Sequence, residues 1–186
     1  MFKFGPNFIN QTEPCLEMGR SFIVKEYQGS FHALFMLWRG ISTFMCHHPR
    51  YRTLYGTVSI SKLYDTRSAA FVRDALVTPT KDVEPVKPFS LDIHPEIKDY
   101  SKDYSLKDAI GPMLASVEHD SKDIPVLLKH YMKLEADFHC LGIDQSFNDT
   151  PGLLLSVNLP NAPAKQLKLY LADGRDEYLA YDPSKN

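Results

Sequence analysis

The stretch CLEMGRSFIV, residues 15–24, is apolar at both ends but carries Glu17, Gly19 and Arg20 in its middle. Its apolar ends predict a β-strand. In a regular strand a glutamate and an arginine three residues apart point to opposite faces, because side chains alternate. A glycine between them can open a bulge that turns both side chains toward one cleft. Glu17 and Arg20 are therefore candidate site residues, with a surface ion pair as the alternative.

The residues that follow predict how this strand is placed in the fold. Apolar residues recur at helical spacing from Phe31 to Cys46, which predicts a buried helix. The stretch Arg52–Ser61 is rich in β-formers and alternates, which predicts a second strand. A strand, a helix and a strand in this order form a parallel crossover.

The remaining segments predict one domain of the α/β (α+β) class, with a partly parallel twisted sheet and flanking helices. Asp65 can cap the first of the later helices, and "IGP" at Ile110–Pro112 is expected to interrupt the second. The other expected elements are a hairpin that joins residues 2–9 to the first strand, helices over 66–76, 105–118, from Ser121 onward and over 164–171, strands over 136–143 and 152–159, a Pro- and charge-rich excursion over 78–104, and a polar tail.

Composition restricts the partners and the location of the chain. Its 186 residues carry a net charge of −2, so an electrostatic partner must be recognised by a local patch and nucleic acid is not expected. The three cysteines, Cys15, Cys46 and Cys140, form no CxxC motif and suggest neither a disulfide framework nor a zinc site. With no export signal, we expect a cytoplasmic protein without a bound metal or cofactor.

Two loops carry candidate binding residues. The stretch KEYQGSF, residues 25–31, joins a strand to a helix N-terminus, where free N–H groups favour an anion such as phosphate; a plain turn is an equal alternative. Its candidates are Gln28, Gly29 and Ser30. In GIDQSFND, residues 142–149, we expect one of Asp144 and Asp149 to cap a turn and the other to orient a substrate amine.

The stretch HHPRYR, residues 47–52, places cationic side chains just after a helix. It predicts either compensation of the helix dipole or a docking patch for an acidic partner or anionic headgroups, through His47, His48, Arg50 and Arg52. Covalent catalysis is not expected, because no GxSxG motif is present and His119, Asp120 and Ser121 are merely adjacent.

Two segments in the same order resemble a known family. The first is EMGRS with Tyr27, Gln28, LWRGI and LYGTVS; the second is PVLLKHYMKL followed by DQSFND. Together they resemble the lipoamino-acid N-acyltransferases of the GNAT superfamily, which make ornithine and glycine lipids and are often labelled hemolysins. The resemblance covers about residues 2–159.

This resemblance implies an acyltransferase that moves a 3-hydroxyacyl chain to the amine of glycine or ornithine. Glu17 would deprotonate the amine and Arg20 would support it, while the thioester would lie between the 15–24 and 52–61 strands. Amides near Met18 or Gly19 would polarise its carbonyl, with Ser21 in the same motif. The motif also assigns Ser59 to substrate orientation.

The chain departs from this family in three respects. No second glycine follows Gly29, which favours acyl carrier protein over coenzyme A as donor. Glu135 replaces a frequent glycine. The two strands and two helices that normally precede the first strand have no counterpart, so we expect either a truncated domain or a partner that supplies them. A homo-oligomer and peripheral contact with the inner membrane are separate expectations for this chain.

Two other functions remain open at this point. The acyl-homoserine-lactone synthases share the Glu-x-x-Arg pattern, so an autoinducer synthase is one alternative. A non-catalytic remnant that binds acyl carrier protein or membranes through residues 47–52 is the other.

Overall fold

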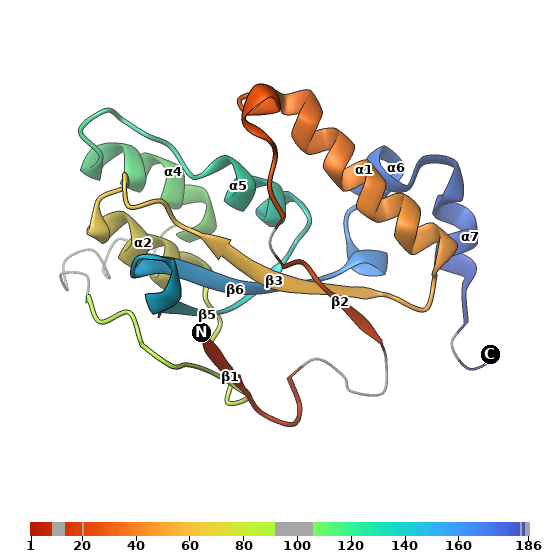
Figure 1. The fold of residues 1–186 in the computed structure, drawn as a ribbon, viewed down its shortest axis with the longest axis horizontal. Helices are drawn as coiled ribbons and strands as arrows, with labels where there is room; N and C mark the ends of the chain where they lie inside the picture. Colours follow the sequence, from red (N-terminus) through yellow and green to blue (C-terminus); the bar gives the residue numbers. More distant parts are fainter. Residues whose placement is uncertain (9–13, 20, 92–105, 183, 185–186) are drawn as a thin grey trace.

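The computed structural model describes residues 1–8, 14–19, 21–91, 106–182 and 184. At its centre lies a mixed four-stranded sheet in the order β2-β3-β6-β5, as Figure 1 shows. The strands are β2 (Cys15–Glu17), β3 (Thr53–Ser59), β5 (Asp137–Asp144) and β6 (Thr150–Asn158). Helices and a partly parallel sheet together confirm the predicted α/β (α+β) class.

The predicted crossover is confirmed. β2 pairs in parallel with β3, and α1 (Phe31–His47) connects the two strands. The pairing is short, because β2 ends at Glu17 instead of continuing to Val24, and Met18 adds one further hydrogen bond from its N–H to the carbonyl of Tyr55 at 2.7 Å. β3 continues to Ser59 against β6, which runs antiparallel to it and to β5.

The helices cover one face of this sheet. Their buried side chains join Leu54, Val58, Leu153, Leu155 and Val157 of the sheet in one hydrophobic core. Side chains on a strand alternate, so these residues define a helix-covered face, and the residues between them define the opposite face. The helices are α1, α2 (Thr66–Leu76), α4 (Leu106–Val117), α5 (Val126–Lys133), α6 (Ala164–Leu171) and α7 (Arg175–Ala180).

Several of these helices match their predictions closely. α2 and α6 have the predicted bounds, and the Asp65 carboxylate accepts a hydrogen bond from the Arg67 N–H as the predicted cap. The expected interruption of α4 was wrong, because the helix passes through Pro112. α5 begins at Val126, later than the predicted Ser121, because Ser121 has a positive φ of 53°.

The opposite face of the sheet is covered by the N-terminal residues, not by helices. β1 (Phe2–Phe4) pairs antiparallel with β4 (Val83–Pro85), so the predicted hairpin with the first strand was wrong. Phe2 and Phe8 pack on Val83, Cys140 and Leu154, which explains this pairing, since it buries apolar side chains that a hairpin with β2 would leave beside solvent. β4 also adds a strand to the predicted excursion, of which residues 92–105 lie outside the described part.

The predicted polar tail contains α7, and this helix is held by contacts with the two residues just before β3. Tyr178 is fully buried, and its hydroxyl donates to the carbonyl of Tyr51 at 2.9 Å. Arg52 donates to the Tyr178 carbonyl at 2.6 Å and stacks over its ring at 4.8 Å. The tail prediction failed because a single aromatic residue anchors a segment that is otherwise polar.

Glu135 follows α5 with a φ of 56°, a left-handed conformation in which glycine is normally preferred. A residue with a side chain is strained there. We expect Glu135→Gly to raise the free energy of unfolding by about 0.5–1 kcal/mol. This value is the strain relieved in the folded chain minus the conformational entropy that glycine adds to the unfolded chain. Urea unfolding checks this value. Glu84→Gly in β4, where φ is negative, should lower stability, and equal effects of the two changes would contradict the prediction.

His130 of α5 lies among Trp38, Tyr131 and Tyr170, and its Nε2 atom is buried without a hydrogen-bond partner among the described residues. Burial, with a smaller contribution from Lys133, lowers the pKa of His130 to about 4. Between about pH 4 and pH 6.5 the unfolded chain therefore binds a proton that the folded chain does not. This contribution to stability is complete above pH 6.5 and is lost as the pH falls toward 4.

Thermal unfolding from pH 4 to pH 7 checks this pH dependence. The melting temperature of the native chain should fall more steeply on acidification than that of His130→Phe, because phenylalanine keeps the ring and cannot titrate. Parallel curves for the two proteins would show that His130 does not cause the loss.

Candidate functional site

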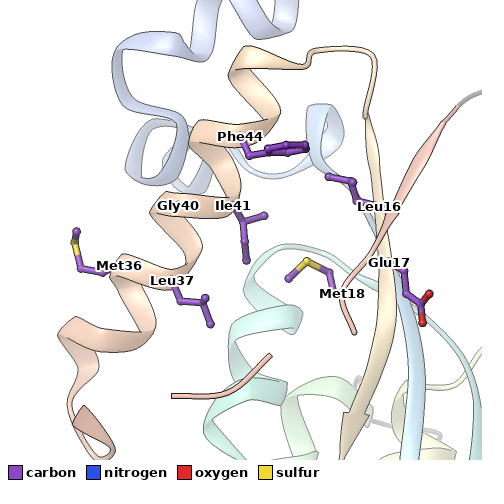
Figure 2. A pocket seen from close by; sticks show the side chains of 8 residues that line it. All are labelled: Leu16, Glu17, Met18, Met36, Leu37, Gly40, Ile41 and Phe44. Carbon is purple, nitrogen blue, oxygen red and sulfur yellow. The ribbon is translucent and has the colours of Figure 1, made fainter. Parts of the chain in front are cut away.

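An open apolar groove of about 490 Å³ lies between β2 and α1. The side chains of Leu16, in β2, and of Met18, in the loop that follows it, point toward α1, as Figure 2 shows. The facing wall of α1 contributes Ile41 and Phe44, and Gly40 leaves open space in it, since no atom lies within 4 Å of the position that a Cβ would occupy there. The groove therefore has the size and apolar character of a site for a hydrocarbon chain. Its lining residues are Leu16, Glu17, Met18, Met36, Leu37, Gly40, Ile41 and Phe44.

Glu17 lies beside this groove, but its carboxylate points away from it. Figure 2 shows the side chain on the opposite side of the strand from Leu16 and Met18. This orientation follows from the alternation of side chains, which places Glu17 on the same face as its register partner Tyr55. Burial raises the pKa of Tyr55, and the charge of Glu17 raises it further, so the phenol stays protonated at neutral pH beside the carboxylate.

The two parallel strands diverge immediately after Glu17. Gly56 permits their last close approach, because a Cβ at this position would lie 2.9 Å from the carbonyl oxygen of Met18. From there the chain leaves toward the short 3-10 helix Lys25–Tyr27 while β3 continues to Ser59. Among the described residues no strand pairs with this edge of β3 beyond Met18. We refer to this unpaired edge of β3, up to Ser59, as the gap.

The other predicted residues of this motif have less support. Arg20 lies outside the described residues, so its predicted role is neither supported nor contradicted. The N–H of Met18 is already bonded to Tyr55, which leaves Gly19 as the amide that could polarise a carbonyl. Gly19 opens no bulge, because the strand has ended, and a Cβ there would lie 3.6 Å from Glu17 Oε1. Ser21 is exposed in the loop that follows.

The loop before α1 is organised as a turn. Gln28 donates through Nε2 to the carbonyl of Ile23 at 2.8 Å, so its side chain closes the loop. Gly29 has a φ of 78°, which favours glycine, and Ser30 occupies the N-cap position of α1 without a side-chain cap. These residues end the turn and begin the helix, and nothing further in the loop marks a phosphate site.

Ser59 lies at the end of β3, and Asp144 and Asp149 lie at the β5–β6 turn. Ser59 is the register partner of Gly152 and lies four residues beyond Tyr55, or about 13 Å along β3. Asp144 accepts from the N–H and hydroxyl of Ser146 at 3.0 and 2.6 Å, which lowers its pKa and confirms the turn-capping role for one aspartate. Asp149 forms an ion pair with Lys87 at 2.8 Å. The structure does not bring these residues together with Glu17.

The predicted docking residues lie at the C-terminal end of α1. His47, His48 and Arg50 are exposed there, with His48 packed on Phe44 at the end of the groove. Arg52 is instead bonded to Tyr178 and belongs to the packing of α7. α1 has 17 residues, so this cluster lies about 24 Å along the helix from the loop at its start.

A row of polar side chains crosses the sheet on the face opposite the helices. Register places Glu17 beside Tyr55 and Tyr55 beside Ser156. His139 Nε2 lies 2.8 Å from the Ser156 hydroxyl, at a register shift in β5 between Phe138 and Cys140. The shift leaves His139 without a register partner. Because Phe138 points into the helix-covered core, alternation places His139 on the polar face. Tyr55, Ser156 and His139 were not predicted from the sequence, since only the register of four strands reveals the row.

Among the described residues no cluster of three or more His, Cys, Asp or Glu side chains could hold a metal ion. Within the same ranges, none of the helices has the length and apolarity needed to cross a membrane. Comparisons with protein-family models, with curated proteins and with solved structures give no match to this chain.

Proposed function

We propose that the chain is an N-acyltransferase that moves a 3-hydroxyacyl chain from acyl carrier protein to the amine of glycine or ornithine. The observation that carries this proposal is the apolar groove beside Glu17 at the point where two parallel strands diverge. The acyl chain would occupy the groove on the helix-covered face. The amine would bind on the opposite face beside Glu17 and Tyr55, and the two reactants would meet through the gap beyond Met18.

The polar residues at this gap suit the proton transfers of the reaction. Glu17 accepts a proton from the substrate ammonium, directly or through a water molecule. The free amine then attacks the thioester carbonyl, and the amide of Gly19 is placed to stabilise the negative oxygen that forms. The carbon–sulfur bond breaks as the amide forms, and the attacking nitrogen releases its second proton to water. The thiolate takes a proton from Tyr55, which Glu17 can restore. Atoms and charges balance without a metal or cofactor.

This arrangement also favours one direction for the donor. With the thioester near Met18, the acyl chain runs along α1 toward Phe44, and the carrier contacts the loop before α1, where Lys25 is exposed. The cluster of His47, His48 and Arg50 then lies at the far end of the acyl chain. A carrier arm has no adenosine diphosphate, which agrees with a loop that is organised as a turn.

The direct test is incubation of the purified chain with 3-hydroxyacyl carrier protein and glycine or ornithine. We expect an N-acyl amino acid, detected by mass spectrometry, with release of one thiol per amide formed. Glu17→Gln should lower the rate by about 10²–10⁴-fold, the usual contribution of a general base. Glu84→Gln, an exposed glutamate of β4, should leave the rate unchanged.

Two results of this assay would overturn the proposal. One is binding of the acylated carrier without any amide product. The other is product only when S-adenosylmethionine is the acceptor, with formation of a lactone.

The groove itself can be tested through Gly40, because a side chain there enters open space without displacing neighbours. Gly40→Leu should not harm folding, since leucine favours a helix more than glycine does. We expect it to lower transfer of long acyl chains by roughly tenfold or more, while transfer of an acetyl group changes little. The measurement is the ratio of kcat/KM for the two donors.

Thr43→Leu is the matched control, because Thr43 is exposed on the same helix and does not line the groove. Equal loss for long and short donors in Gly40→Leu would place the acyl chain elsewhere.

A further inference from the structure

A second set of reactive side chains lies on the opposite face of the sheet from the groove. The Ser156 hydroxyl and His139 Nε2 are 2.8 Å apart, and Asp137 is the register partner of Ser156 on the same strand as His139. We propose that Ser156 is a nucleophile activated by His139, and that the pair hydrolyses esters and thioesters with a short acyl group. This proposal does not rest on the acyl transfer proposed above.

The geometry of the pair suits a nucleophile and its base. With the ring proton on Nδ1, His139 accepts the hydrogen bond from Ser156 through Nε2. The bulge in β5 leaves His139 without a register partner, and its Nε2 lies against Ser156, which is the register partner of Asp137. Asp137 acts on His139 through its charge, which favours the imidazolium that forms when Ser156 loses its proton.

Burial keeps the imidazole of His139 neutral at pH 7. It lowers the pKa of His139, and the charge of Asp137 opposes this shift only in part. A neutral imidazole can take the serine proton, so the pair is in its reactive state at neutral pH.

The surroundings of the pair indicate the class of substrate. Phe8 lies edge-on to His139 with ring centroids 5.1 Å apart, and Phe4, which is 53% exposed, stacks on Phe8 at 4.9 Å. These rings form an apolar ledge beside the nucleophile for the aryl or alkyl part of an ester. Ser156 is only 8% exposed, so we expect its hydroxyl to react with short acyl groups in preference to long ones.

The reaction balances with water as the only co-reactant. Ser156 Oγ attacks the acyl carbon, His139 takes the hydroxyl proton, and the bond to the alcohol or thiol breaks as the leaving group receives that proton. Water then attacks the acyl-serine ester with His139 again as base. The products are a carboxylic acid and the free serine.

An alkyl fluorophosphonate and p-nitrophenyl acetate test this proposal on the full chain, without amine acceptor or carrier protein. We expect the fluorophosphonate to modify Ser156, as located by mass spectrometry of peptides. Hydrolysis of the acetate should fall by about 10²-fold or more in Ser156→Ala and in His139→Gln. Ser116→Ala, an exposed serine on α4, should behave as the native chain does.

His139→Gln keeps a hydrogen-bonding partner for Ser156, so it separates loss of the base from loss of the fold. The pH dependence of labelling adds a readout that a structural role would not produce: the rate should rise in one step with a midpoint below pH 6.5. Absence of label at Ser156 in the folded protein would overturn the proposal. Labelling that is unchanged in His139→Gln would do the same.

Discussion

The parallel pairing of Cys15–Glu17 with Thr53–Tyr55 is the constraint on which the rest of the structure depends. Parallel neighbours cannot be joined by a tight turn, so the chain must cross over, and α1 is that crossover. The crossover places α1 opposite β2 and so creates the groove. Gly56 lets the carbonyl of Met18 approach β3 closely, and the strands separate directly after this contact. Pairing, groove and gap are therefore consequences of one short ladder.

The register of the sheet divides its residues between two chemically different faces. Leu54, Val58 and Leu155 point into the helix-covered core, and the residues between them point the other way. On that second face a cross-strand row contains Glu17, Tyr55 and Ser156, and His139 lies against Ser156 beside a bulge in β5. A shift of one residue in the register of β3 would turn Tyr55 toward the core and Leu54 and Val58 away from it. Correct packing of the helices thus also aligns the polar row.

Local signals were sufficient to predict much of the fold from the sequence. The capping aspartate, Asp65, and the proline beyond α2 indicated both ends of that helix. Alternation indicated β3, and apolar segments indicated β5 and β6. The errors concern contacts between residues far apart in the chain. β1 pairs with residues about eighty positions later, and α7 is held through Tyr178 by Tyr51 and Arg52.

The candidate site was predictable to a similar extent. Glu17 was found because a charged residue in an apolar strand is conspicuous within its own segment. Tyr55, His139 and Ser156 each look ordinary in theirs, and only the register of four strands brings them together. One of Asp144 and Asp149 was correctly expected to cap a turn, since that role depends on neighbours in sequence, and the structure shows that it is Asp144. Arg52 was not placed, because its partner lies 126 residues away.

An edge strand with alternating side chains solves a problem that any transfer of a fatty acyl group to an amino acid presents. The hydrocarbon chain requires an apolar surface, whereas the ammonium group requires water and a carboxylate, so the two substrates cannot share one lining. Leu16 and Met18 face the groove, and Glu17 between them faces the polar side. Three consecutive residues thus supply both environments. The reacting atoms of the two substrates can meet only where β2 ends, because elsewhere the hydrogen-bonded sheet separates its two faces. The early end of β2 is therefore the feature that would permit acyl transfer.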